Sequence, residues 1–149
     1  MNIASILRTE TIDLAMTAAT KEEAIAKMAA LVGGAGFLSD QEQYVKDVLI
    51  RESSSSTGIG FGVAIPHGKS AGVKSPLLAF AKFTEPVEWA SMDGSPVTMA
   101  FLIGVPVEQA GQEHLKILTT LARKLIHESF RQTLMEASSA EDVLQALDF

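Results

Sequence analysis

The stretch that most constrains the fold runs from Val97 to Val105 and is almost continuously apolar. A run of this length without alternating polar residues is typical of a strand buried on both faces of a sheet. Leu77 to Phe83 forms a second apolar run of strand length. Helical patterns alternate with such runs early in the chain and cluster near its end. The sequence therefore predicts an α/β layer fold, with helices on both faces of a β-sheet.

Two segments have the spacing of a capping box, in which the first residue is the N-cap of a helix: Thr20-Lys21-Glu22-Glu23 and Ser39-Asp40-Gln41-Glu42. The first helix should stop at Gly33-Gly34. The second should end near Arg51-Glu52, before a serine loop from Ser53 to Ser56. The other predicted elements are helices at 1–8, 112–125, 128–136 and 140–147, an extended segment at 10–14 and a loop at 86–96.

Composition limits the classes of protein to consider. The 149 residues, 47% hydrophobic and 20% charged, fit one globular domain spanning residues 1–149. The absence of cysteine excludes disulfides, thiol catalysis and thiolate metal sites, and fits a reducing cytoplasm. A net charge of −6 argues against nucleic acid as a partner but permits pairing with a basic protein patch. No apolar run approaches the roughly 20 residues that span a bilayer, and no secretory signal pattern is present, so we expect a cytoplasmic protein without membrane insertion.

The segment that points most directly to chemistry is Val63-Ala64-Ile65-Pro66-His67-Gly68. Val63 to Ile65 has the pattern of a short buried strand, and Pro66, which has no N–H, should end it. We therefore expect His67 at a strand-to-loop corner, where its ring faces solvent from a stiff base. A neutral imidazole is nucleophilic near pH 7, which suits a residue that accepts a group and passes it on. The alternative is a loop histidine without a role.

His114 lies near the start of the predicted 112–125 helix, three and four residues before Ile117 and Leu118. This spacing places it at the head of an apolar stripe that faces inward. A histidine there is more often a buried structural residue, but beside His67 it could donate a hydrogen bond to phosphoryl oxygens. The helix N-terminus would add backbone donors and a favourable dipole. His127, in a polar connection between helices, is expected to be a surface residue.

Two further features each admit a structural and a functional interpretation. Arg51 and Glu52 are either an ordinary solvated pair at a helix end, or Arg51 supplies positive charge to an anion site. Gly58, Gly60 and Gly62 are either a flexible lead-in to the strand or a nest of backbone N–H groups that binds an anion.

Three other kinds of site fit the sequence poorly. Gly68-Lys69-Ser70 matches the end of a nucleotide-binding P-loop, but Val63 occupies the position of that motif's first glycine. No two histidines have the i, i+4 spacing of a helical zinc site. The G-x-S-x-G elbow of a serine hydrolase is also missing. Neither a metal nor another cofactor is therefore expected.

A family resemblance follows from these residues. Glu52, Ile59-Gly60 and the segment from Val63 to Gly68 resemble the phosphorylation-site pattern of the fructose/mannitol-type enzyme IIA domains of the bacterial phosphoenolpyruvate-dependent sugar phosphotransferase system. The likeness continues in Arg51-Glu52 before a Ser-Thr-Gly loop, in Pro86-Val87-Glu88-Trp89 with Met92-Asp93-Gly94, and in Glu113-His114-Leu115 with Leu118 and Leu121.

The resemblance implies a mixed sheet with helices on both sides, in a three-layer α/β/α arrangement. It implies a phosphotransferase in which His67 is phosphorylated by the small histidine-containing phosphocarrier protein, with His114 as the second active-site histidine and Arg51 stabilising the phosphoryl group. The acceptor would be a cysteine of an enzyme IIB domain, through which the chain would associate with a membrane enzyme IIC. Nitrogen-type relatives keep the same histidine but use its phosphorylation state to control other proteins. The segment from Pro86 to Gly94 is more similar to the fructose branch, which favours a role in sugar transport.

Overall fold

The computed structural model describes residues 3–109 and 112–148, and the side chains of residues 4, 109 and 112–114 lie outside that description. Its centre is a mixed sheet in the order β1-β5-β6-β3-β2, with β4 also paired to β6. The central strand β6 runs antiparallel to β5 and parallel to β3 and β4. The strands are β1 (Ile12–Met16), β2 (Gly58–Gly60), β3 (Val63–Ala64), β4 (His67–Ser70), β5 (Leu77–Val87) and β6 (Val97–Pro106), and the helices are α1 (Lys21–Gly34), α2 (Gln41–Ser54), α3 (Gln112–Leu125), α4 (Glu128–Glu136) and α5 (Ala140–Ala146), with short 3-10 turns η1 (Ile3–Ile6), η2 (Thr9–Thr11) and η3 (Val107–Gln109).

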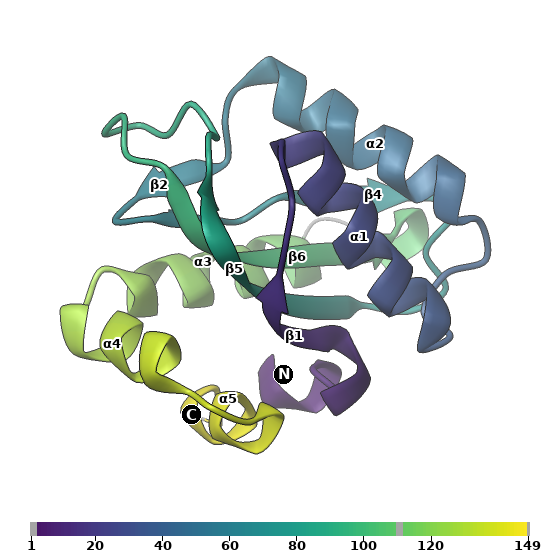
Figure 1. Ribbon diagram of the computed structural model, residues 1–149. Helices are drawn as coiled ribbons and strands as arrows, with labels where there is room; N and C mark the ends of the chain where they lie inside the picture. The colour runs from purple at the N-terminus through teal and green to yellow at the C-terminus, as the bar shows by residue number, and fades with distance from the viewer. Residues whose placement is uncertain (1–2, 110–111, 149) are drawn as a thin grey trace.

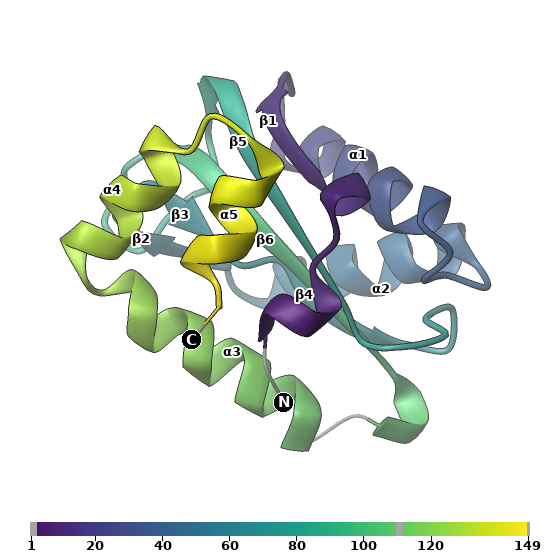
Figure 2. The same ribbon diagram turned by 90° about the horizontal axis from the view of Figure 1, so that it is seen from below.

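Helices cover both faces of the sheet, as predicted. The pair α1 and α2 lies on one face, and α3, α4 and α5 lie on the other (Figures 1 and 2). Two apolar cores result, because the side chains of β6 alternate between them: Leu102 packs with the α1 and α2 layer, and Phe101 and Ile103 pack with the opposite layer. Among the described residues, no helix combines the length and apolar character needed to cross a membrane.

The capping pattern predicted the N-cap residue correctly for one of two helices. Thr20 caps α1 as predicted, because its side chain accepts the N–H of Glu23 at 3.1 Å. The prediction of Ser39 as the next N-cap was wrong. Asp40 caps α2, since its carboxylate accepts the N–H of Gln43 at 3.1 Å. A carboxylate caps as well as a hydroxyl and adds a favourable charge at the helix N-terminus.

Several element boundaries also differ from the prediction. The serine loop begins later than expected, because α2 continues through Ser54, whose hydroxyl donates to the carbonyl oxygen of Arg51. Strand β5 extends through Pro86, which sits where the pairing with β6 changes register and so breaks no regular ladder. Strand β1 begins two residues after Glu10, and the N-terminal helix is reduced to η1; positions 1 and 2 of that prediction lie outside the described residues.

The prediction that His67 stands at a strand-to-loop corner was wrong. Strands β3 and β4 pair with β6 in one unbroken register, from Val63 opposite Met99 to His67 opposite Ile103 and beyond. Pro66 removes one N–H from the ladder, but its carbonyl oxygen still accepts the N–H of Ile103 at 3.1 Å. The chain therefore continues along β6, and His67 is the first residue of a strand rather than of a loop.

The three closely spaced glycines build a hairpin rather than an anion nest or a flexible lead-in. Gly58 and Gly60 belong to β2, which pairs antiparallel with β3. The connecting residues Phe61 and Gly62 both have positive φ, 62° and 76°, as a two-residue type I′ turn requires. The N–H of Phe61 donates to the carboxylate of Asp93 at 3.1 Å, which holds this non-glycine residue in place.

Candidate active site

The ring of His67 is held by the backbone just before it. The residue is 9% exposed, and its Nδ1 lies 2.8 Å from the carbonyl oxygen of Ile65. A carbonyl oxygen can only accept a hydrogen bond, so in the neutral ring Nδ1 carries the proton and donates it to Ile65. The lone pair of the neutral imidazole is then on Nε2. This is the tautomer required for nucleophilic attack by Nε2.

The surroundings of His67 favour the neutral ring. Burial lowers the pKa of His67 below its ordinary value of 6.5, and the positive charge of Arg51 acts in the same direction. The hydrogen bond to Ile65 and the carboxylate of Glu52 oppose this, but the net direction is downward. At pH 7 the imidazole is therefore mostly uncharged.

Two surface depressions, of about 360 and 340 Å³, meet at His67, and both are also lined by Arg51. The first is bordered by polar and charged residues, and the second is more apolar and reaches across to α3. The first is completed by Asp47, Ile50, Gly68 and Lys69, and the second by Ser55, Ser56, Thr57, Ile59, Ile65, Met92, Leu118 and Ala122.

Arg51 lies in the last turn of α2 and is partly buried. Its Nη1 donates to the carbonyl oxygen of Ser55 at 2.9 Å and to the hydroxyls of Ser54 and Ser55 at 3.4 and 3.3 Å. Within the described part of the chain, every side-chain hydrogen bond of Arg51 leaves from Nη1. The other guanidinium N–H groups can therefore be used for an anion in the depressions that Arg51 shares with His67.

The interpretation of Arg51 and Glu52 as a solvated pair was wrong, because Glu52 is 4% exposed. Its two carboxylate oxygens accept the N–H and the hydroxyl of Thr57, the first at 2.8 Å, and Lys21 Nζ approaches to 3.5 Å. Trp89, which is fully buried, donates its indole N–H to the Thr57 hydroxyl at 3.3 Å. Sequence reasoning missed this buried network. Its signal was the position of Glu52 four residues after the apolar Val48, on the buried face of α2.

The other two histidines lie in different surroundings. His114 lies in the first turn of α3, as expected, but its side chain is outside the described residues. Leu118, one helical turn further on, lines the second depression together with His67, so this part of α3 borders the site. His127 is exposed and precedes α4 as its N-terminal flanking residue, as predicted for a surface position.

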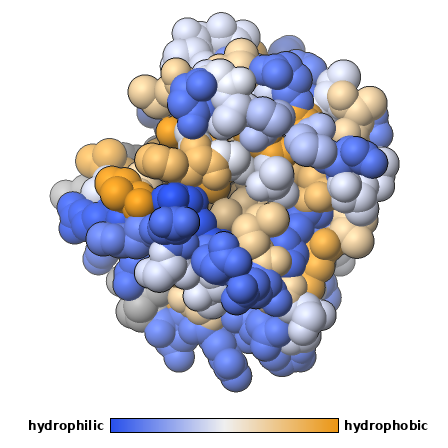
Figure 3. All heavy atoms as spheres, turned by 60° about the vertical axis from the view of Figure 1, so that its left-hand side comes forward, coloured by the Kyte–Doolittle hydropathy of each residue, from blue (hydrophilic) through white to orange (hydrophobic). Residues whose placement is uncertain are grey.

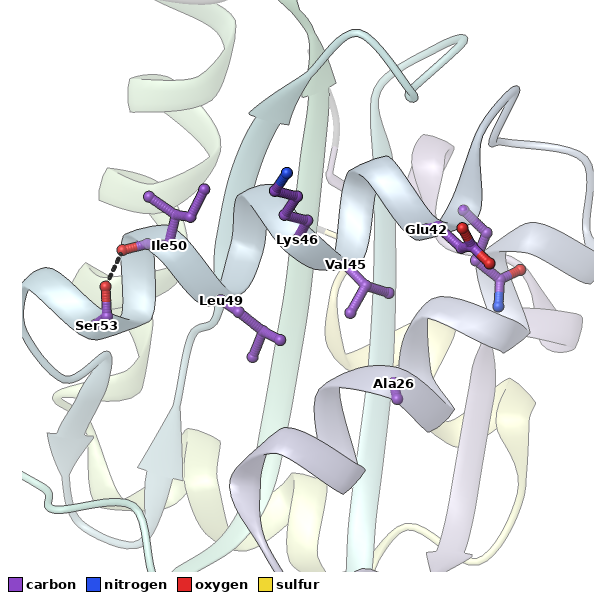
Figure 4. Close-up of a pocket in the computed structure, with 8 residues that line it drawn as sticks. Ala26, Glu42, Val45, Lys46, Leu49, Ile50 and Ser53 are labelled. Atoms are coloured by element: carbon purple, nitrogen blue, oxygen red, sulfur yellow. Dashed lines mark hydrogen bonds between the residues drawn. The ribbon is translucent and has the colours of Figure 1, made fainter.

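A larger hollow, of about 570 Å³, lies elsewhere, between the outer surfaces of α1 and α2 (Figure 4). Its lining includes apolar side chains such as Val45 and Leu49, with Glu42 and Lys46 at the edge, but no histidine. The described residues also contain no group of three histidine, aspartate or glutamate side chains that could hold a metal ion. We therefore place the candidate site at His67, where a nucleophile, a cation and an open depression coincide.

Comparison with known proteins agrees with the fold and this motif. Residues 5–149 match the family described as "Phosphoenolpyruvate-dependent sugar phosphotransferase system, EIIA 2", and the chain belongs to this family. Domains of this family are phosphotransferases that pass a phosphoryl group through a histidine, as phosphocarriers in sugar transport.

Individual relatives differ in length. The chain is 39% identical to the "PTS system fructose-specific EIIA component" of Haloferax volcanii, over 98% of this chain and 94% of that protein. It is 38% identical to a fructose-specific EIIABC component of Bacillus subtilis, of which it spans 23%.

Two solved structures share the fold over nearly the whole chain. The nitrogen regulatory protein IIA-Ntr of Neisseria meningitidis has a TM-score of 0.88 and 38% identity, covering 97% of this chain and 98% of that one. Enzyme IIAMTL of Escherichia coli, solved in complex with phosphorylated enzyme IIBMTL, has a TM-score of 0.79 and 27% identity, covering 95% and 97%.

Proposed function

We propose that His67 is the phosphorylated residue of a phosphocarrier in sugar uptake. The observation that carries the proposal is the hydrogen bond from Nδ1 to the carbonyl oxygen of Ile65. It fixes the tautomer with the lone pair on Nε2, on a ring that the surroundings keep neutral at pH 7. This ring borders the two depressions through which a donor and an acceptor would reach it.

The proposed step transfers a phosphoryl group between two imidazoles. Nε2 of His67 attacks the phosphorus atom of the phosphorylated donor histidine, and the donor's P–N bond breaks with its electron pair returning to the donor ring. The proton on Nδ1 of His67 stays in the bond to Ile65, so the new phosphoimidazole carries a ring proton that the carbonyl oxygen stabilises. When a thiolate attacks the phosphorus in turn, the P–Nε2 bond breaks and His67 returns to its neutral form.

Two side chains would offset the charge of the phosphoryl group, which is close to two negative charges at neutral pH. Arg51 is held by Ser55 through Nη1, which leaves guanidinium N–H groups for the phosphoryl oxygens. His114 would donate from the first turn of α3, where the helix N-terminus adds favourable backbone dipoles. Both roles are electrostatic and would be strongest as charge moves between donor and acceptor.

The family and the surface around His67 support a proposal for the partners. We propose the histidine-containing phosphocarrier protein as donor and a cysteine of an enzyme IIB domain as acceptor, and association with a membrane enzyme IIC through that IIB domain. The IIAMTL–IIBMTL complex supports the second. Met92, 83% exposed, gives the second depression an apolar rim suited to a protein partner. On the face drawn in Figure 3, apolar side chains lie in scattered groups beside hydrophilic ones.

Fructose-type transport is the form of this function that we favour. The Haloferax volcanii relative named as a fructose-specific EIIA component aligns over almost its full length. We propose that residues 1–149 act as one enzyme IIA domain in the cytoplasm. Enzyme IIB and IIC genes beside the gene for this chain would support the transport role.

One observation favours a second function. The IIA-Ntr structure of Neisseria meningitidis is 38% identical, close to the 39% of the fructose-specific relative. In this alternative, His67 is phosphorylated in the same way, but its phosphorylation state controls other proteins. A panel of purified IIB domains separates the two functions, since only a transport protein would pass its phosphoryl group to one of them.

Phosphorylation itself is tested with phosphoenolpyruvate, the first enzyme of the system and the phosphocarrier protein. We expect a mass gain of one phosphate that is acid-labile and base-stable, and that disappears in His67→Ala. His127→Ala is the matched control, because His127 is exposed and outside the depressions. Undiminished phosphorylation of His67→Ala would remove the proposal.

A further inference from the structure

Glu52 is a buried carboxylate with a defined set of partners. It is 4% exposed, although a glutamate is almost never buried unless its charge is paired. One oxygen accepts the backbone N–H of Thr57 at 2.8 Å, and the other accepts its hydroxyl. Both bonds hold the same residue, so the carboxylate fixes the backbone and the side chain of Thr57 together.

From Thr57, two hydrogen bonds lead to the ring of His67. The carbonyl oxygen of Thr57 accepts the N–H of Ile65 at 3.0 Å. The carbonyl oxygen of Ile65 in turn accepts Nδ1–H of His67 at 2.8 Å. Glu52 is thus connected to the catalytic ring by consecutive hydrogen bonds, although it does not touch the reacting atom. The chain just before Thr57 also holds Arg51, because the carbonyl oxygen of Ser55 accepts a hydrogen bond from its guanidinium.

Two further side chains make this carboxylate rigid. Lys21 Nζ lies 3.5 Å from Glu52 and 3.4 Å from the carbonyl oxygen of Trp89. The indole of Trp89 donates to the Thr57 hydroxyl, and Ser56 donates to the Trp89 carbonyl oxygen at 2.7 Å. The result is a closed ring of contacts around Thr57, in which a shift of Glu52 would release the Thr57 backbone.

We propose that Glu52 is a positioning residue for phosphotransfer, which acts through Thr57 and Ile65 to hold His67 with its proton on Nδ1. This inference rests on the proposed role of His67. Outer-shell hydrogen bonds set the tautomer and the orientation of histidines that act through their other nitrogen. If the Thr57 backbone moves, the Ile65 carbonyl oxygen leaves Nδ1, the proton can settle on Nε2, and the lone pair needed for attack is lost.

The test separates the reach of the Glu52 side chain from its charge. Glu52→Asp keeps the carboxylate but withdraws it by one methylene from Thr57, whereas Glu52→Gln keeps the reach and one oxygen that can accept the Thr57 N–H. We expect Glu52→Asp to lower the transfer rate by ~10–100-fold and to raise the Nε2–H population of His67. Glu52→Gln should stay within about 10-fold of wild type, with mostly the Nδ1–H form. Glu42→Ala, exposed on the same helix, is the matched control.

The measurements are ¹⁵N chemical shifts of the His67 ring in the unphosphorylated protein and single-turnover phosphotransfer from the phosphocarrier protein. A folded Glu52→Asp with the wild-type tautomer and rate would overturn the inference, as would Gln being more damaging than Asp. If Glu52→Asp does not fold, Glu52→Gln still tests the inference. If Glu52 acted only through its charge, Glu52→Gln would transfer much more slowly than wild type while His67 kept its tautomer, and that result would overturn the inference. The tautomer is measured on the unphosphorylated protein, so this result does not depend on phosphotransfer. If wild-type His67 were not phosphorylated at all, the proposed function would be refuted independently of the tautomer result.

Discussion

Replacing Arg51 tests whether the cation beside His67 acts on the phosphoryl group or only ends a helix. Two unit charges about 4 Å apart interact by about 4 kcal/mol at an effective dielectric of about 20. Arg51 is partly exposed, so solvent screens some of this. A remainder of roughly 3 kcal/mol corresponds to a factor of about 10² in rate. We therefore expect Arg51→Ala to slow phosphotransfer by about 10²-fold, in line with the loss of one charge-stabilising donor.

Arg51→Lys should be intermediate, slower than wild type by about 10-fold. A lysine keeps the charge but lacks the planar fork that lets Arg51 bond Ser55 through Nη1 and present further N–H groups to an anion. The pKa of His67 provides a second readout. Since the charge of Arg51 lowers this pKa, Arg51→Ala should raise it and Arg51→Lys should change it less.

The assay is single-turnover transfer from the phosphorylated phosphocarrier protein at pH 8, where His67 is neutral in all three proteins and differences in its protonation drop out. Thermal unfolding should differ little, because a cation near a helix C-terminus contributes about 0.3–1 kcal/mol. Equal transfer rates for wild type, Arg51→Lys and Arg51→Ala would refute the reasoning and leave Arg51 with the role of a helix terminator.

Two further predictions concern the histidines. The pKa of His67 is lower in the folded chain than its ordinary 6.5, so the unfolded chain binds protons more readily. The stability of the protein should therefore fall as pH drops below about 6.5 and level off below the folded pKa. The urea midpoint should depend less steeply on pH between about pH 5 and 8 in His67→Gln than in wild type, and an identical dependence would contradict this. His114→Ala should slow transfer by roughly 10²–10³-fold while circular dichroism stays unchanged; wild-type rates with both partners would make His114 a packing residue only.

Local patterns predicted those parts of the fold that neighbouring residues determine. Thr20 caps α1 because the cap and its partner Glu23 lie three residues apart, which the sequence displays directly. The choice of Asp40 over Ser39 was not visible in this way, since both residues can cap and adjacent positions compete. In the structure, the N–H groups of both residues donate to the carbonyl oxygen of Gly72, so a distant loop contacts the start of α2.

The burial of Glu52 shows the same limit at the site. Its charge favoured a surface position, whereas its spacing from Tyr44 and Val48 placed it on the buried face of α2. The structure resolves this conflict through Thr57 and Lys21, which satisfy the carboxylate inside the protein. No local pattern in the sequence pairs Glu52 with Lys21, because these residues meet only when α1 and α2 pack on the sheet.

The position of His67 depends on contacts that are still more distant in the chain. The N–H of Ile65 donates to the carbonyl oxygen of Thr57, and the carbonyl oxygen of Pro66 accepts the N–H of Ile103 in β6. Strand β2 begins at Gly58, opposite Ala64, so its pairing with β3 does not extend to the carbonyl oxygen of Ile65, which accepts from the His67 ring. The proline, which from sequence marks a strand end, thus lies within a line of pairing to β6. The tautomer of His67 follows from where the neighbouring strand stops, and a sequence motif cannot specify that by itself.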